Sequence, residues 1–258
     1  HGTVGTGKSV CLKELMHQAR ANKQRAVIYD KGCDFVRSFY RPGKDIILNP
    51  LDERTESWDI WSECRDGADF DTMAAALMPL PSAGTSDPFW INAARTIFAC
   101  LGHRMLHDPE RSNLALLQNL FTSELDNLHA LLQGTEAETL VSPKTEKTAL
   151  NVKSVLANYL KPLKYLKEDD VSFSIRDWLQ DDGSDSWLFI SSQSDKHETL
   201  KPLISAWFNT VANGLLSLPP SRDRRIWVFL DELPTLHQLP YLPGAFAEAR
   251  KFGGCLVA

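Results

Sequence analysis

The sequence predicts an α/β fold, in which a parallel β-sheet is flanked by helices and interrupted by an all-α domain. Short apolar segments alternate with helical segments near both ends of the chain, a pattern typical of parallel sheets because both faces of each strand are buried. Between residues 56 and 169 the strand signals disappear, and apolar residues recur at three- and four-residue steps. We therefore expect three regions, 1–55, 56–169 and 170–258, of which the first and the third share one sheet.

The first region is expected to contain one helix and two strands. The helix covers roughly residues 8–23, where helix-forming residues predominate. Arg25–Asp30 is predicted as a short buried strand that ends in a carboxylate. Asp45–Pro50 is predicted as a second strand, closed by proline.

The other two regions are assigned by the same periodicities. The middle region is expected to hold amphipathic helices at Phe70–Leu80, Phe89–Leu106, Leu114–Phe121, Leu125–Leu132 and Thr148–Leu166. In the third region we expect strands at Trp187–Ser191, Arg225–Glu232 and Gly254–Ala258, and helices at Leu200–Leu218 and 242–252.

Composition narrows the class of protein. The 258 residues are 43% hydrophobic and 24% charged, as in an ordinary globular protein with a core. A net charge of −5 gives no overall attraction to nucleic acid, so any DNA contact must come from local patches. The five cysteines include no C-x-x-C pair, which favours reduced thiols over disulfides or a zinc site. Without an initiator Met, a signal peptide or a transmembrane run, the chain is expected to be a piece of a longer protein.

The chain begins with a phosphate-binding motif. Gly2-Thr3-Val4-Gly5-Thr6-Gly7-Lys8-Ser9 fits the pattern G-x-x-x-x-G-K-[ST]. In such a loop backbone N–H groups point at phosphate oxygens, and side chains at the glycines would block that approach. Lys8 is expected to reach the β- and γ-phosphates, and the Ser9 hydroxyl to bind Mg²⁺. The helix that follows would direct its positive end at the same phosphates.

A second motif lies near the other end of the sequence. Five apolar residues, Ile226–Leu230, are followed by Asp231 and Glu232. Because ligands bind beyond the carboxyl ends of strands in open α/β sheets, both carboxylates are expected beside the phosphate-binding loop. Asp231 would hold Mg²⁺ together with Ser9, and Glu232 would orient and deprotonate an attacking water. Alone, this pattern is also typical of a strand end and a turn; together with the loop it predicts a nucleotide hydrolase.

Five longer phrases resemble the TraD branch of the type IV secretion coupling proteins. They are Asp45–Asp52, Phe173–Leu179, Leu200–Trp207, Asp231–Leu236 and Glu248–Gly254. The resemblance runs from His1 to Ala258, and these phrases are more specific than the two nucleotide motifs, which many ATPases share. It implies a RecA-like P-loop NTPase, whose nucleotide-binding domain comprises 1–55 and a truncated second part, 170–258, separated by the all-α domain at 56–169.

The resemblance also implies a function. Members of this family are hexameric, DNA-dependent ATPases anchored in the bacterial inner membrane, and they link the relaxosome to the conjugative secretion channel. For this chain the resemblance implies ATP and Mg²⁺ as cofactors. It implies single-stranded DNA, the relaxase with its accessory proteins, the type IV secretion channel and further copies in a homo-hexamer as partners.

The resemblance assigns a role to Arg250 as well. In family members an arginine at this place reaches into the ATP of the neighbouring subunit, where positive charge speeds phosphoryl transfer. The alternative is a surface arginine beside Lys251. Family strands expected before the phosphate-binding loop and after Ala258 are missing, so the chain by itself is expected to hydrolyse ATP weakly.

Two other functions fit the same motifs. A septal-type translocase of duplex DNA would share them, but the size of the helical insertion and the five phrases argue against it. In the other alternative ATP acts as a switch, and the all-α domain docks relaxosome proteins. Residues 56–169 would then bind these partners whatever happens at Lys8.

Three further features have ordinary explanations that we weigh against functional ones. The segment 143–168 carries six lysines and two glutamates, which could contact DNA phosphates, although a solvated helix face is commoner. His103 and His107 have the spacing of a metal-binding pair, but no third ligand is evident and a surface helix end is favoured. Asp30 is either a neighbour of the nucleotide or part of the turn that ends its strand.

Overall fold

A computed structural model describes residues 8–80, 87–232, 235–236, 244 and 247–257. These residues belong to two compact units. The first unit comprises His1–Glu56, Ile175–Leu200 and Trp207–Ala258, and the second comprises Ser57–Ser174 and Lys201–Ala206.

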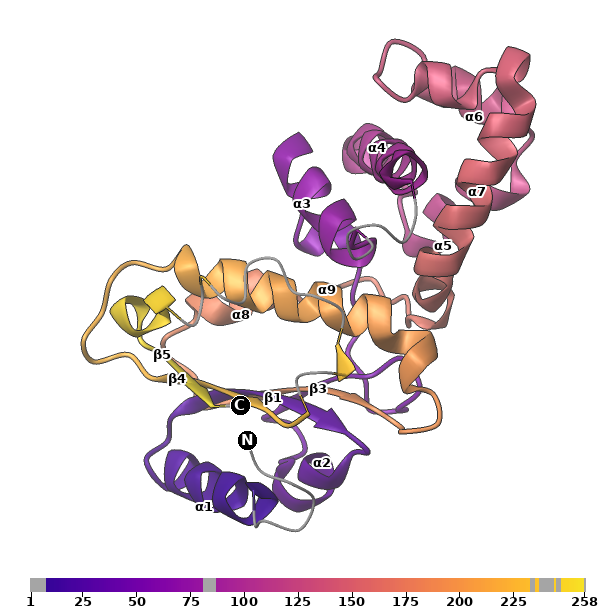
Figure 1. Ribbon diagram of the computed structural model, residues 1–258. Coiled ribbons are helices and arrows are strands. Elements are labelled where there is room, and N and C mark those ends of the chain that lie inside the picture. The colour runs from indigo at the N-terminus through magenta and orange to yellow at the C-terminus, as the bar shows by residue number, and fades with distance from the viewer. Residues whose placement is uncertain (1–7, 81–86, 233–234, 237–243, 245–246, 258) are drawn as a thin grey trace. The chain divides into compact units, whose positions relative to one another are not determined.

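The first unit is built on a five-stranded sheet of the described strands, in the order β2-β3-β1-β4-β5 (Figure 1). The strands are β1 (Arg25–Lys31), β2 (Ile46–Leu48), β3 (Trp187–Ser192), β4 (Ile226–Leu230) and β5 (Gly254–Val257). Every neighbouring pair is parallel. Tyr29 of β1 lies between Ile190 of β3 and Leu230 of β4, so these three strands end at one edge of the sheet. The parallel α/β fold that the sequence predicts is confirmed.

Helices cover both faces of this sheet, which explains why the strands are apolar along their length (Figure 1). On one face lie α1 (Lys8–Ala21) and α2 (Asp34–Phe39). On the other lie α8 (Ile175–Gln180) and the part of α9 (His197–Leu216) that belongs to the first unit. All six residues of β3 are buried, as are the first six of β1.

Helix α1 packs on the sheet through one apolar stripe. Leu12, Met16 and Ala19, spaced four and three residues apart, belong to the same core cluster as β1 side chains. Only residues 22–24 join α1 to β1. A helix of 14 residues is about 21 Å long and must turn back along the strand, so α1 runs antiparallel to β1. Lys8, its first residue, therefore lies at the edge of the sheet where the strands end.

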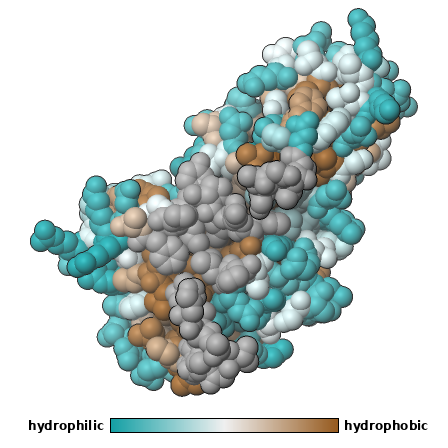
Figure 2. Space-filling view, viewed as in Figure 1, coloured by the Kyte–Doolittle hydropathy of each residue, from teal (hydrophilic) through white to brown (hydrophobic). Residues whose placement is uncertain are grey.

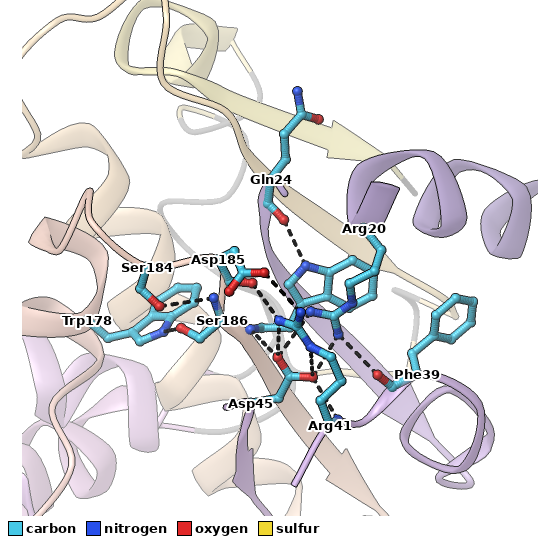
Figure 3. Close-up of polar contacts among 10 residues, drawn as sticks. Arg20, Gln24, Phe39, Arg41, Asp45, Trp178, Ser184, Asp185 and Ser186 are labelled. Atoms are coloured by element: carbon cyan, nitrogen blue, oxygen red, sulfur yellow. Dashed lines mark hydrogen bonds and ion pairs between the residues drawn. The ribbon is translucent and has the colours of Figure 1, made fainter. Parts of the chain in front are cut away.

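A buried carboxylate ties the other end of α1 to the edge where the strands begin (Figure 3). Asp45 accepts hydrogen bonds from the Arg20 guanidinium at 2.7 and 3.1 Å and from the backbone N–H of Trp187 at 2.9 Å. Arg41 donates to the same carboxylate through its backbone N–H at 2.8 Å and its guanidinium at 3.1 Å. The Arg20 guanidinium also stacks on the Trp187 ring, 3.5 Å from its centroid. These contacts fix the direction in which α1 points along the sheet.

The described part of Ser57–Ser174 in the second unit is helical. Its α-helices are α3 (Gly67–Leu77), α4 (Pro88–Arg104), α5 (Asn113–Leu117), α6 (Leu125–Leu132) and α7 (Glu146–Leu160). Short 3₁₀ segments occur at Ile60–Ser62, Met105–His107, Glu138–Val141, Pro143–Thr145 and Lys161–Tyr165, and a π-helical turn at Gln118–Thr122. Helices α3 and α4 approach closely at Gly102, where a Cβ atom would lie 2.6 Å from the Phe70 ring.

The predicted elements are found with shifted ends. The helix predicted at Thr148–Leu166 is α7 followed by a 3₁₀ segment, because Pro162 cannot donate the backbone hydrogen bond that an α-helix needs. The strand predicted at Arg225–Glu232 ends at Leu230. In the predicted helix 242–252, residues 249–252 form a 3₁₀ segment, and residues 242, 243, 245 and 246 lie outside the described residues.

Two helices were not predicted. Both α2 and α8 have six residues, too few to show a helical period.

The visible surface of both units is mostly hydrophilic (Figure 2). Within the described residues, no helix combines the length and apolar character that spanning a membrane would require.

Candidate functional site

The predicted phosphate-binding loop lies largely outside the described residues, which begin at Lys8. Lys8 is the first residue of α1, and Ser9 is exposed in its first turn. The first backbone N–H groups of a helix have no partners within the helix and carry partial positive charge. No acidic side chain lies in this first turn of α1 to compete for them. The amino end of α1 therefore suits an anion such as a phosphate group.

Asp231 and Glu232 lie at the same edge of the sheet as the amino end of α1. They follow Leu230, which ends β4 and is paired with Tyr29 of β1. Glu232 has a φ of 60°, a left-handed conformation that residues with a side chain rarely adopt. Its Oε2 atom lies 3.5 Å from Nζ of Lys31, the last residue of β1. The structure thus places Ser9, Asp231 and Glu232 at one edge of the sheet.

Asp30 has a structural role at this edge. Its buried carboxylate accepts a hydrogen bond from the backbone N–H of Val36 at 2.7 Å. Burial raises the pKa of Asp30, while hydrogen bonds from the backbone of Val36, Phe35 and Asp34 act in the opposite direction. Asp30 therefore caps the amino end of α2, which agrees with the turn alternative.

Arg250 lies at the opposite edge. It belongs to the 3₁₀ segment Ala249–Phe252, just before β5, whose first residue Gly254 pairs with Ile226 at the beginning of β4. Arg250 is exposed and lines an open depression of about 1230 Å³ together with Arg222, Arg225 and Lys251. Within one copy of the chain, Arg250 and Glu232 are therefore not brought together.

The histidine pair is confirmed as a surface helix end. His103 lies in the last turn of α4 and His107 in the following 3₁₀ segment, and both are exposed. In the part of the chain that the structure describes, no cluster of three or more His, Cys, Asp or Glu side chains could hold a metal ion.

Sequence patterns did not identify a hydrogen-bonded group beside Glu232, made of three buried residues and the half-buried Thr235. Tyr29, Ser192, His197 and Thr235 are hydrogen-bonded to one another in the first unit. Burial raises the pKa of Tyr29 to about 12, although its hydrogen bond with Thr235 acts in the opposite direction. A tyrosine within an apolar strand is normally interpreted as a core residue. Only the position of Tyr29, close to the carboxyl end of its strand, could have indicated this group.

Comparison with known proteins places the chain in a family. Over residues 1–258 it matches the family described as "Type IV secretion-system coupling protein DNA-binding domain". It is 46% identical over 264 residues to the coupling protein TraD of Escherichia coli (strain K12), covering 100% of this chain and 36% of TraD. The chain thus spans about a third of the length of this curated relative.

Solved structures support the same assignment. The chain is 35% identical to the bacterial conjugative coupling protein TrwBdeltaN70 in an unbound form, with a TM-score of 0.89 over 100% of this chain and 60% of that one. It is also 35% identical to the plasmid coupling protein TrwB in complex with ADP and Mg²⁺, with a TM-score of 0.89 and coverage of 100% and 62%. These matches confirm the RecA-like fold and the resemblance to TraD. The chain belongs to the type IV secretion-system coupling protein family.

Proposed function

We propose that this chain is the nucleotide-hydrolysing part of a conjugative coupling protein, a DNA-dependent ATPase motor that links the relaxosome to the secretion channel and drives single-stranded DNA transfer. One observation carries the proposal: the amino end of α1 and the pair Asp231–Glu232 lie at the same edge of the sheet. TrwB, which shares the fold, has been solved with ADP and Mg²⁺ and with a non-hydrolysable ATP analogue.

The residues at this edge fit ATP and Mg²⁺. The loop Gly2–Gly7 and the amino end of α1 would hold the phosphates, with Lys8 on the β- and γ-phosphates. Ser9 and Asp231 offer a hydroxyl and a carboxylate, the hard oxygen ligands that Mg²⁺ prefers, and leave positions for water and phosphate oxygens. Bound Mg²⁺ would neutralise charge that develops on the phosphates. Glu232 would orient the attacking water and accept its proton.

The position of Arg250 supports action as a ring. Because Arg250 and Glu232 lie at opposite edges of one sheet, Arg250 would act on the nucleotide of a neighbouring copy. We propose a homo-hexamer in which Arg250 stabilises the transferred phosphoryl group in trans, a contribution of about 10³–10⁵ in rate where it has been measured. From the family we further propose that the full-length protein lies at the cytoplasmic face of the bacterial inner membrane. There the relaxase and its accessory proteins would be partners.

The ATPase rate of the full-length protein, measured with and without single-stranded DNA, tests the central proposal. DNA should stimulate phosphate release, and Lys8→Ala or Glu232→Gln should abolish this stimulation. Glu14→Gln, an exposed carboxylate on α1, is the matched control and should leave the rate unchanged. Full stimulated turnover in both site variants would contradict the proposal.

Mixing two inactive variants tests the action of Arg250 in trans. Arg250→Ala keeps an intact phosphate-binding loop, and Lys8→Ala keeps an intact Arg250. In mixed rings some interfaces would combine the two intact parts, so the mixture should exceed the summed rates of the separate variants. Lys251→Ala, an exposed neighbour, is the control. An Arg250→Ala protein with full turnover would overturn this role.

A further inference from the structure

A buried hydrogen-bonded network connects three elements of the first unit to the turn that carries Glu232. Tyr29 lies near the end of β1, Ser192 ends β3, and His197 begins α9. Their exposed fractions are 0%, 0% and 1%. Tyr29 and His197 are hydrogen-bonded directly to Thr235, which lies three residues beyond Glu232. Ser192 is connected to Thr235 through His197.

The contacts have hydrogen-bonding distances throughout. Oη of Tyr29 lies 2.6 Å from Oγ1 of Thr235 and 3.3 Å from Nε2 of His197. The same Nε2 lies 3.1 Å from the carbonyl oxygen of Thr235, and Nδ1 lies 2.9 Å from Oγ of Ser192. Thr235 donates to the carbonyl oxygen of Glu232 twice, from its hydroxyl at 2.8 Å and from its backbone N–H at 3.0 Å.

Donor and acceptor chemistry gives these bonds a direction. The carbonyl of Glu232 can only accept a hydrogen bond, so the Thr235 hydroxyl donates its proton to that carbonyl. The same hydroxyl must therefore accept a hydrogen bond from Tyr29. Tyr29 has then used its only proton, and the Thr235 carbonyl can only accept, so Nε2 of His197 donates to both. When the imidazole is neutral, its other nitrogen carries no proton, and Nδ1 then accepts from the Ser192 hydroxyl.

The two hydrogen bonds to the Glu232 carbonyl matter because the backbone of Glu232 is strained. Its left-handed backbone is costly for a residue with a side chain, and such conformations persist only where the surroundings over-determine them. The two bonds that Thr235 donates to the Glu232 carbonyl supply part of that constraint. Tyr29 and His197 in turn restrain Thr235 from the end of β1 and from the first turn of α9.

We propose that Tyr29, His197 and Thr235 are positioning residues that hold the Glu232 turn and thereby set the rate of hydrolysis. The inference rests on the proposed function, in which Glu232 deprotonates the attacking water. The three residues act through the backbone of Glu232 and leave nucleotide affinity to the phosphate-binding loop. Loss of the network would therefore lower kcat and leave KM for ATP unchanged.

The Thr235 hydroxyl provides the sharpest test, made in the full-length protein with single-stranded DNA. Thr235→Val keeps the shape of the side chain and removes the hydroxyl, so kcat should fall about ten-fold, a part of the 10²–10⁴-fold that general bases contribute. KM for ATP and binding of a fluorescent ATP analogue should change by less than about two-fold, which also shows that the variant is folded. Thr235→Ser restores the hydroxyl and should recover most of kcat.

Tyr29→Phe tests the next bond in the network. The ring would keep its edge-on contact with Phe208, at 5.5 Å between centroids, and only the hydroxyl would be lost. We expect a lower kcat with unchanged KM. Tyr40→Phe is the matched control, because the Tyr40 ring lies against Phe189 and Arg54 in the same unit, apart from Glu232.

A double variant separates positioning from general destabilisation. If Thr235 acts through Glu232, Thr235→Val should have no further effect on the residual rate of Glu232→Gln, since residues that act as one unit are not additive. An equal fall in both backgrounds, or wild-type kcat in Thr235→Val, would overturn the inference. If Glu232→Gln itself keeps full turnover, the proposed function fails first, so the two failures are distinguishable.

Discussion

Nζ of Lys31 lies 3.5 Å from Oε2 of Glu232, so the residue that ends β1 forms an ion pair with the carboxylate that follows β4. The Glu232 side chain is 60% exposed and that of Lys31 26%. Water screens such a pair, and it contributes at most about 1 kcal/mol to the free energy of unfolding. Its consequence is orientation: the cation draws the Glu232 carboxylate toward the middle of the sheet.

Replacing Lys31 should therefore change activity more than stability. In Lys31→Met the carboxylate loses the cation that orients it, and DNA-stimulated turnover should fall by about ten-fold. This loss is smaller than the roughly 10²-fold that a misplacement of about 1 Å can cause. The melting temperature should shift by less than about 3 °C because the pair is exposed. Lys44→Met, an exposed lysine at the other edge, should change neither quantity. Wild-type turnover in Lys31→Met would refute this orienting role.

Replacing Asp45 should change stability strongly. The Asp45 side chain has no solvent exposure and pairs with both Arg20 and Arg41. Asp45→Asn leaves Arg20 without its carboxylate and removes one of the two that pair with Arg41, and the free energy of unfolding should fall by about 3 kcal/mol in urea titrations. Asp185→Asn removes a carboxylate that pairs with Arg41 and is 31% exposed, and should cost less than about 1 kcal/mol. Equal losses in the two variants would contradict the importance of the buried cluster.

The contact between α3 and α4 should not tolerate a methyl group at Gly102. Alanine favours a helix by about 1 kcal/mol over glycine, but a Cβ atom here would lie 2.6 Å from the fully buried Phe70 ring. Overpacking of a core costs about 1–3 kcal/mol, so Gly102→Ala should be destabilising in thermal unfolding. Gly67→Ala, on α3, is the control, since its nearest neighbour would be the His103 ring at 3.9 Å. A stabilised Gly102→Ala would show that Phe70 moves freely.

Tyr29 should make stability depend on alkaline pH. Burial raises its pKa from 10.0 to about 12, and the charges of Glu232, Glu198 and Asp231 act in the same direction. Because the folded state favours the neutral phenol, this contribution is complete below pH 10.0 and is lost as the pH rises toward about 12. Urea midpoints should therefore fall more steeply over this range for the wild type than for Tyr29→Phe. Parallel curves would contradict the raised pKa.

Elements with a long apolar pattern were predictable from the sequence. β1 was predicted as Arg25–Asp30 and is Arg25–Lys31, because a run buried on both faces has an unmistakable composition. Short elements were not predictable. Helix α2 begins after Cys33, whose left-handed φ of 63° redirects the chain, and nothing in the local sequence marks this conformation.

The candidate site was predictable to the same degree. Asp231 and Glu232 follow an apolar strand, and the edge at which they lie follows from the rule for parallel sheets. The bond between Tyr29 and Thr235 joins residues 206 positions apart, so no local pattern could indicate it. The left-handed φ of Glu232 likewise has no mark in the local sequence.

By itself the sequence determined the fold class, the two nucleotide motifs and the family, because periodicity, motif spacing and family phrases are local properties. The strand order β2-β3-β1-β4-β5 was decided by the tertiary structure. That order sets Tyr29 beside Leu230, and the folded chain brings His197 to Thr235 and separates Arg250 from Glu232. The physical reason is that hydrogen bonds and burial depend on distance in space, and pairing between distant strands has no signature within any one segment.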